Sequence, residues 1–393
     1  MKPADWKPKL RHILVLAWTD QEVGRGIIRG AGLFAFPSRH WAFHLRHPLA
    51  SEMPVIRRLK PDGIIAQVAD EELAECLHRW RGGPVVNVSG VLRETRFPSV
   101  GFDNRAVGRM AAEYFANRGF RHFAYLGQRD RENSDEREAG FREALREREM
   151  DAASLTIKRP AGLNAVAQWD ESDRELHPWL QKLPRPLALL AHNDIFAADA
   201  LRVCSALGIA VPQEIAILGV GSDPIICRLG FPPLSSVALP CEEVGIRAAE
   251  MLAGLLEGKT PACDPELLQP QNVVTRQSSD VFAVDDPAVA AALRHIHLHA
   301  DGPLDVAAVV LQSGVNRRTL ERRFSALLRH SLAQEIVRVR LDRARDLLTA
   351  TDLSLEKVAE TVGFSSAVRL AEVFRRELNL SPGQYRRGAR AAR

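Results

Sequence analysis

The sequence lacks the features of a membrane-spanning or disulfide-stabilised protein. The apolar run nearest the amino terminus, Ile13–Trp18, is too short for a bilayer span or for the core of a signal peptide. The five cysteines lie far apart, are odd in number and form no CxxC pair, so neither a disulfide framework nor a thiolate zinc site is expected. These absences predict a folded cytoplasmic protein with reduced cysteines.

Lysine is almost missing from the last quarter of the chain, where arginine carries the positive charge. From Asp286 onward there are 18 basic residues, of which 17 are arginine, and 12 acidic residues, so this part has a net charge of +6. The preceding residues have a net charge of −2. Because a planar guanidinium suits phosphate groups and guanine edges, this concentration of arginine favours a nucleic-acid partner.

Motifs of common enzyme classes are missing as well. No GxSxG elbow or Walker-type loop occurs. The glycines of Gly24–Gly30 resemble a dinucleotide fingerprint, but they begin five residues beyond the expected strand, and no acidic residue closes a second strand. On a helix, only His295 and His299 of the nearby histidines would share a face, which seldom suffices for a metal. We expect no enzyme activity, cofactor or metal, and an NAD-type enzyme is the least favoured alternative.

Up to about residue 280, short β-branched runs alternate with amphipathic stretches. The expected strands are His12–Trp18, Trp41–Leu45, Gly63–Val68, Pro84–Val88, Ser99–Phe102, His122–Leu126, Leu187–Ala191 and Ile215–Gly219. The helices expected between them include Gly24–Phe36, Glu71–Trp80, Ala106–Arg118, Glu136–Glu149, Ile195–Leu207 and Glu242–Leu256. Such alternation is typical of parallel sheets covered by helices. So many units predict a two-lobed α/β body with two sheets, spanning residues 1–280.

The pattern changes after a short linker at 281–286. From 287 to 393 we find no convincing strand, and an all-α domain is expected. Its predicted helices are Pro287–His299, Leu304–Gln312, Arg317–Leu328, Leu332–Thr349, Ser354–Thr361, Ser366–Glu377 and Pro382–Arg386.

Two helix-turn-helix units follow each other in this domain. In the first, Gly314 marks the turn before Arg317–Leu328, and about fifty residues later Gly363 marks the turn before Ser365–Glu377. The apolar residues expected to face inward are Leu320, Phe324, Leu370 and Phe374. The plan is therefore an internal repeat.

This repeat resembles the DNA-binding domain of AraC/XylS-type regulators over roughly Pro287–Arg387. The matching residues are Arg340, Ala344, Leu347, Leu348, Ala359, Gly363, Phe364, Ser365, Phe374, Ser381, Pro382, Tyr385 and Arg386. The resemblance implies that one rigid connecting helix sets two recognition helices into major-groove segments of double-stranded DNA about 34 Å apart. Candidate base or phosphate contacts are Asn316, Arg317, Arg318, Thr319, Arg322, Ser365, Ser366, Ala367 and Arg369. Any one of these arginines could instead be only solvated surface.

The body resembles the effector-binding core of lactose-repressor-type regulators, which has a periplasmic-binding-protein fold. The resemblance covers about residues 10–280, and residues that carry it include Gly101, Phe102, Asp103, Asn104, Arg137, Gly140, Phe141, His192, Asn193 and Asp194. This core followed by an AraC-type domain is similar to the arrangement in XylR-type regulators of xylose operons. The resemblance implies a homodimer controlled by a small sugar such as xylose bound between the lobes, with RNA polymerase as a partner if the protein is an activator.

The resemblance also assigns an effector site. Residues that match its sugar-binding positions, or lie beside them, are Asp103, Arg137, Trp169, Asn193, Gly221 and Asp223. Other roles are open, since Asp103 could cap a helix, Arg137 could pair with a glutamate and Trp169 could belong to the core. Gly221 stands where the family commonly has a sugar-binding Asp, so either Asp223 substitutes or the ligand differs. A body that only dimerises or senses a non-sugar ligand is therefore kept as an alternative.

Overall fold

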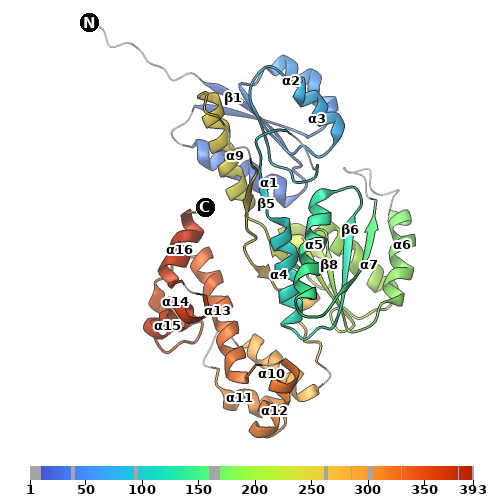
Figure 1. The fold of residues 1–393 in the computed structure, drawn as a ribbon, viewed down its shortest axis with the longest axis vertical. Coiled ribbons are helices and arrows are strands. Elements are labelled where there is room, and N and C mark those ends of the chain that lie inside the picture. The colour runs from blue at the N-terminus through green and yellow to red at the C-terminus, as the bar shows by residue number, and fades with distance from the viewer. Residues whose placement is uncertain are drawn as a thin grey trace. The chain divides into compact units, whose positions relative to one another are not determined.

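The computed structural model describes residues 10–36, 40–92, 96–158, 169–260, 264–284, 286–299, 304–328, 330–378 and 380–391. The chain divides into two compact units (Figure 1). The first contains Met1–Glu113 and His122–Ser279, and the second contains Tyr114–Arg121 and Asp280–Arg393.

The first lobe of the first unit is built on a four-stranded parallel sheet. Its order is β2-β1-β3-β4, with bounds β1 Arg11–Leu16, β2 Trp41–Arg46, β3 Gly63–Ala66 and β4 Val85–Asn87. Four helices cover it, namely α1 Glu22–Ala35, α2 Met53–Leu59, α3 Glu71–His78 and α9 Cys241–Leu256. Ile13 packs with the α1 and α9 side, whereas Leu14 packs with the α2 and α3 side. Both faces are thus buried, which explains the continuous apolar strands.

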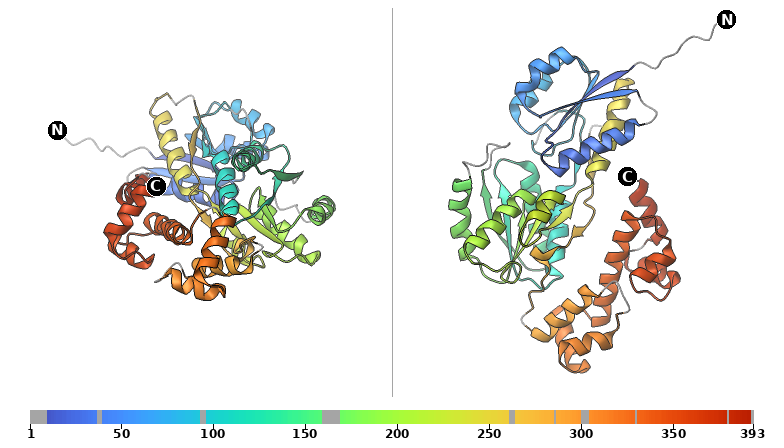
Figure 2. Two further views of the ribbon diagram at one scale, coloured as in Figure 1. Left: turned by 60° about the horizontal axis from the view of Figure 1, so that its bottom comes forward. Right: turned by 180° about the vertical axis from the view of Figure 1, so that it is seen from behind.

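Helices α1 and α9 run side by side (Figure 1 and Figure 2). A Cβ at Gly26 would lie 2.4 Å from the Cβ of Cys241, and a Cβ at Gly30 would lie 1.9 Å from the carbonyl oxygen of Glu242. These glycines are therefore required for helix packing. The segment that resembles a dinucleotide fingerprint has this structural role.

The second lobe is built on a six-stranded sheet with the order β12-β10-β9-β8-β6-β7, in which β12 alone pairs antiparallel. The strands are β6 His122–Gln128, β7 Ala152–Ile157, β8 Leu187–Ala191, β9 Ile215–Gly221, β10 Ser235–Ala238 and β12 Val273–Val274. A separate two-stranded ladder joins β5 Val100–Phe102 to β11 Glu266–Leu268. The lobe's helices are α4 Asn104–Ala116, α5 Glu132–Arg146, α6 Trp169–Lys182, α7 Asp194–Ala206 and α8 Pro224–Leu229.

Helices α6 and α7 contribute to the core on one face of this sheet, and α5 packs on the other, where Phe141 contacts Phe123. The predicted two-lobed α/β body with parallel sheets is confirmed. Every predicted strand of the body is present, but the prediction missed β7, β10, β11 and β12, and it missed the helices α2, α6 and α8.

The described residues of the second unit form helices joined by turns and loops, with no strand among them. The seven helices predicted after residue 286 are present as α10 Pro287–Leu298, α11 Val306–Ser313, α12 Arg317–Leu328, α13 Leu332–Ala350, α14 Leu355–Thr361, α15 Ala367–Leu378 and α16 Pro382–Ala391. The first half of α13 packs Leu332 and Ile336 into a core with α10, α11 and α12. Its second half packs Ala344 and Leu348 into another core with α14 and α15. One continuous helix therefore supports both helix-turn-helix units.

Two segments outside the numbered helices of this unit also belong to its fold. Arg118 lies over the ring of Tyr114 at 3.5 Å, and its carbonyl accepts the N–H of Ala283 at 3.0 Å. Phe282 is buried in the first core, and Asp286 caps α10. The segment 281–286, expected as a linker, thus provides a core residue and a helix cap.

A buried charged cluster lies at the start of α13. The carboxylate of Glu335 is fully buried, and its oxygens accept hydrogen bonds from Arg338 at 2.6 and 2.9 Å and lie 2.8 Å from Nε2 of His330. The hydrogen bond to Glu335 raises the pKa of His330 above its usual 6.5.

This raised pKa predicts a pH-dependent stability. The contribution of the His330–Glu335 pair is present in full below about pH 6.5 and is lost as the pH rises through the folded-state pKa. We expect the melting temperature to fall more between pH 6 and pH 8 in the wild type than in a His330→Gln variant, as measured by calorimetry of the whole chain. An equal pH dependence in the two proteins would contradict this assignment.

Candidate functional site: the DNA-binding surface and the effector cleft

The two helix-turn-helix units are built in the same way. Gly314 ends α11 with φ +69°, and Gly363 follows α14 with φ +76°, a left-handed backbone that favours glycine. The side chain of Asn316 accepts the N–H of Thr319 at 2.9 Å, and Ser366 accepts the N–H of Arg369 at 3.1 Å. Asn316 and Ser366 are therefore N-caps of the two recognition helices, fifty residues apart.

In each helix-turn-helix unit, an arginine side chain donates a hydrogen bond to a backbone carbonyl at an equivalent position. Nη2 of Arg340 donates to the carbonyl of Leu304 at 2.8 Å, and Nη2 of Arg386 donates to the carbonyl of Leu353 at 2.6 Å. Each carbonyl belongs to the residue that precedes the N-cap of the unit's first helix. The matched arginines of the AraC-type pattern thus have a structural role.

The outer face of α12 is strongly basic. Arg317 pairs with Glu321 at 2.9 Å, and Arg323 pairs with Asp286 at 3.0 Å. Arg318 and Arg322 are exposed, lie one turn apart and have no acidic partner among the described residues. They are therefore the best placed of the predicted residues to contact DNA, whereas Thr319 is half-buried.

The outer face of α15 has a different character. At the fifty-residue offset, Val368 takes the place of Arg318, and Glu372 takes the place of Arg322. Val368 is 69% exposed, and Arg369 pairs with Glu372 at 3.0 Å. The remaining predicted residues lie at the start of α15 and are Ser365, Ser366 and Ala367. The sequence prediction omitted Val368, which the repeat offset would have identified.

Three of the predicted effector residues lie at the carboxyl ends of parallel strands, where ligands bind in open α/β sheets. Asp103 follows β5, Asn193 follows β8 and Gly221 ends β9. One oxygen of Asp103 accepts the N–H of Ala106 at 2.9 Å, and the side chain of Asn193 accepts the N–H of Phe196 at 3.0 Å. Both side chains are therefore helix caps, as the alternative interpretation of Asp103 proposed.

Arg137, on α5, is a buried charged group. Its Nε donates to Oδ1 of Asn104 at 2.9 Å, and Nη1 donates to the carbonyl of His192. These partners are neutral oxygens and not the glutamate considered from the sequence. Burial lowers the pKa of Arg137. A buried guanidinium without a carboxylate partner among the described residues is suited to a polar ligand.

His192 is a neighbouring group that the sequence prediction used only as part of the resemblance. It is 4% exposed, its ring contacts Phe196 edge-on, and its Nδ1 has no hydrogen-bond partner among the described residues. Burial, followed by the charges of Arg137 and Arg131, lowers its pKa well below 6.5. A neutral imidazole with an unpaired nitrogen can donate to or accept from a ligand hydroxyl.

The departure at Gly221 has a structural cause. Gly221 has φ +123°, and a Cβ there would lie 3.3 Å from Oδ2 of Asp194. Burial raises the pKa of Asp194, whose Oδ1 accepts the hydroxyl of Ser236 at 2.5 Å and whose Oδ2 accepts the N–H of Asp223 at 2.7 Å. Asp194 therefore already places a carboxylate beside Gly221.

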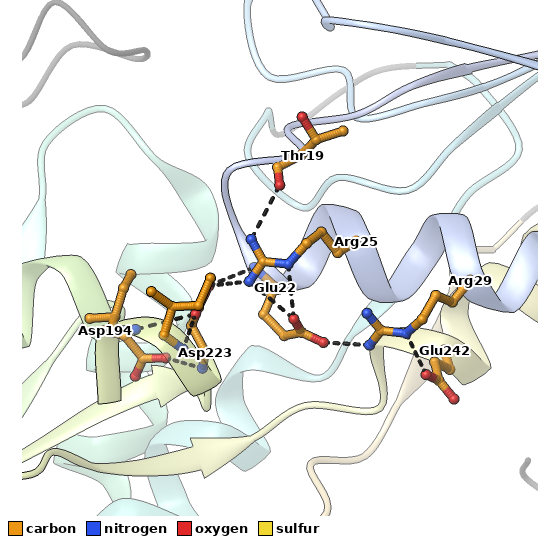
Figure 3. A network of polar contacts seen from close by, with 9 residues as sticks. Thr19, Glu22, Arg25, Arg29, Asp194, Asp223 and Glu242 are labelled. Carbon is orange, nitrogen blue, oxygen red and sulfur yellow. Dashed lines mark hydrogen bonds and ion pairs between the residues drawn. The ribbon is translucent and has the colours of Figure 1, made fainter. Parts of the chain in front are cut away.

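Asp223 is occupied by protein groups (Figure 3). Its Oδ1 accepts the N–H of Ile225 at 2.9 Å, and its Oδ2 accepts the N–H of Glu22 at 3.0 Å and Nη2 of Arg25 at 2.6 Å. No oxygen of Asp223 is thus left without a protein donor.

A cleft of about 810 Å³ opens between the lobes beside α3 and the start of α5. Its lining includes His78, Arg129 and Arg131, and Arg131 donates to the carbonyl of Ala69. None of the predicted effector residues lines this cleft, although α5 also carries Arg137. Trp169 begins α6, and its side chain lies outside the described residues.

Comparison with known proteins extends over the whole chain. Residues 112–279 match the periplasmic binding protein-like domain family, and residues 310–388 match a helix-turn-helix domain family. The chain is 29% identical to the xylose operon regulatory protein of Haemophilus influenzae, covering 92% of this chain and 94% of the relative. The corresponding protein of Escherichia coli K12 is 28% identical and is covered to 97%. The chain is a XylR-like transcription regulator.

Solved structures agree with this assignment. The structure of the xylose-binding transcription activator xylR aligns with a TM-score of 0.61 and 26% identity, covering 97% of this chain and 99% of that chain. A CelR–cellobiose complex aligns with a TM-score of 0.55 over 70% of this chain at 22% identity, which supports the fold alone. The XylR-like regulator thus has both domains in the order that the sequence predicted.

No described helix is both long and apolar enough to cross a bilayer. No three His, Cys, Asp or Glu side chains in the described ranges are placed to share a metal ion.

The geometry around Gly221 predicts the result of restoring the family's Asp. A Gly221→Asp variant would adopt a strained backbone and place a second carboxylate beside Asp194, so we expect a loss of about 1–3 kcal/mol in the free energy of unfolding. Denaturant unfolding of the whole chain measures this loss. The control is Gly32→Ala, where a Cβ meets nothing within 4 Å. A Gly221→Asp protein as stable as the wild type would contradict the explanation.

Proposed function

We propose that this XylR-like regulator binds double-stranded operator DNA as a homodimer in the cytoplasm, and that a small sugar such as D-xylose, held between the lobes, controls this binding. The observation that carries the proposal is the buried pair formed by Arg137, on α5, and His192, at the carboxyl end of β8, in a fold shared with regulators named for xylose. RNA polymerase is a further partner if the protein is an activator.

The chemistry of this pair suits a sugar. Guanidinium donors, a neutral imidazole and partly exposed caps such as Asp103 and Asn193 offer both donors and acceptors to hydroxyl groups. The two recognition helices offer different surfaces to DNA. Arg318 and Arg322 suit phosphate and guanine, whereas the exposed methyl groups of Val368 suit the methyl group of thymine.

A second candidate function is a body that only dimerises or senses a non-sugar ligand. It is favoured because Gly221 has no side chain to offer a sugar, and because both carboxylate oxygens of Asp223 already accept hydrogen bonds from the protein. Thermal unfolding in the presence of pentoses, hexoses and uronates distinguishes the two, because a ligand that binds only the folded state raises the melting temperature. A saturable rise with one sugar supports a sensor, and no rise with any of them supports the second candidate.

The DNA-binding role of α12 is tested by removing its two unpaired arginines. We expect the Arg318→Ala/Arg322→Ala protein to bind a duplex selected by the wild type from a random pool about tenfold or more weakly, with a shallower salt dependence. The matched control is Arg57→Ala/Arg58→Ala, which removes two exposed arginines from α2 of the body. Unchanged affinity of the α12 variant in fluorescence anisotropy would exclude that helix as a DNA contact.

The effector role of Arg137 is tested with Arg137→Met, which removes the buried donors. We expect this variant to lose the sugar-induced rise in melting temperature and to keep its DNA affinity in the absence of sugar. Arg146→Met, at an exposed position of the same helix, should respond to sugar as the wild type does. If DNA binding collapses in Arg137→Met, Arg137 has a structural role and not an effector-binding role.

A further inference from the structure

A network of charged groups crosses from the first lobe to the second near the ends of β1 and β9 (Figure 3). Oδ2 of Asp223, in the second lobe, accepts Nη2 of Arg25 at 2.6 Å and the backbone N–H of Glu22 at 3.0 Å. Glu22 and Arg25 belong to the first turns of α1, in the first lobe. A single carboxylate oxygen thus binds both a guanidinium and the positive end of a helix.

Each half of this contact is fixed by its own lobe. Arg25 is held in the first lobe by Glu22, at 3.1 Å, and by the carbonyl of Thr19, at 3.2 Å. Asp223 is held in the second lobe because its Oδ1 caps α8 and its N–H donates to Asp194. Preorganised side chains lose little rotamer freedom when the lobes meet. The side chain of Asp223 is 5% exposed and that of Arg25 is 25% exposed, so the pair is shielded from water.

We propose that Arg25 and Asp223 form a latch that holds the two lobes closed, and that they are positioning residues for the effector and not ligands of it. The role in effector binding rests on the proposed function, whereas the closing role does not. Opening the lobes would separate Asp223 from Arg25 and from the N-terminus of α1. The latch therefore raises the fraction of molecules with a closed cleft before any effector binds.

This fraction sets the apparent affinity for the effector. The apparent dissociation constant equals the intrinsic constant divided by the fraction of binding-competent molecules. Breaking the latch should therefore weaken effector binding although no ligand contact is lost. The latch also gives Asp223, which lies two residues beyond Gly221, a function that does not require a ligand.

The closing role is tested in the whole chain without effector. Spin labels are placed through noncanonical amino acids at Arg79, after α3 of the first lobe, and at Lys182, the last residue of α6 of the second. Double electron–electron resonance then reports the distance between the lobes. The variants are Arg25→Gln, Asp223→Asn and the double variant, and Asn keeps the cap of α8. The control is Arg29→Gln, since Arg29 pairs with Glu22 and Glu242 inside the first lobe.

We expect a narrow distance distribution in the wild type and in Arg29→Gln. Arg25→Gln and Asp223→Asn should show longer and broader distances, and the double variant should be no more open than either single variant, because the two residues act as one pair. Circular dichroism melting confirms that each variant is folded. Identical distributions in the wild type and in a folded Arg25→Gln variant would overturn the latch.

A second measurement separates the latch from the proposed function. D-xylose is titrated into the same variants by calorimetry, and we expect on the order of five- to tenfold weaker binding in Arg25→Gln and in Asp223→Asn than in Arg29→Gln. Equal affinities in all three would overturn the positioning role. If D-xylose binds none of the proteins, including the wild type, the sugar assignment fails, and the distance measurement still decides whether the latch exists.

Discussion

The hydrogen bonds of the buried Asp194 carboxylate are the interactions on which the effector side of the body depends. It accepts the hydroxyl of Ser236, in β10, and the N–H of Asp223, so it joins β10 to the chain that follows β9 and fixes that chain. Its position excludes side chains nearby, since a Cβ at Gly219 would lie 2.3 Å from Oδ1 of Asp194. A buried carboxylate is stable only when its oxygens are satisfied by donors, and here the backbone of the strand end supplies one of them.

The position of Asp223 follows from this constraint. Because its N–H is held by Asp194, its carboxylate points toward α8 and the start of α1 (Figure 3). The family resemblance suggested that Asp223 could replace the sugar-binding Asp missing at Gly221. Its hydrogen bonds instead support the roles that we propose, with effector specificity assigned to Arg137 and His192 and closure of the lobes assigned to Asp223.

Features encoded by neighbouring residues were predictable from the sequence. The bounds of α12 are those predicted, because Gly314 and Asn316 signal its start and the apolar spacing defines its buried face. The capping role of Asp103 was also considered, since its partner is three residues away. The strand β10 was missed because its serines are buried by partners such as Asp194 and Ser278, more than forty residues away. The partner of Asp223, Arg25, is 198 residues distant and has no local signal.

The connectivity of the chain limits how the effector can influence DNA binding. The two units are joined by three backbone crossings, after Glu113, Arg121 and Ser279. The helix α4 contains the first crossing, because its residues from Tyr114 onward belong to the second unit. It begins in the first unit at Asn104, whose side chain accepts a hydrogen bond from Arg137. A ligand shifts an equilibrium only through different affinities for two states. Under the proposed function, a sugar bound by Arg137 would influence the second unit through the 13 residues of α4, provided that the Arg137–Asn104 contact differs between the two states.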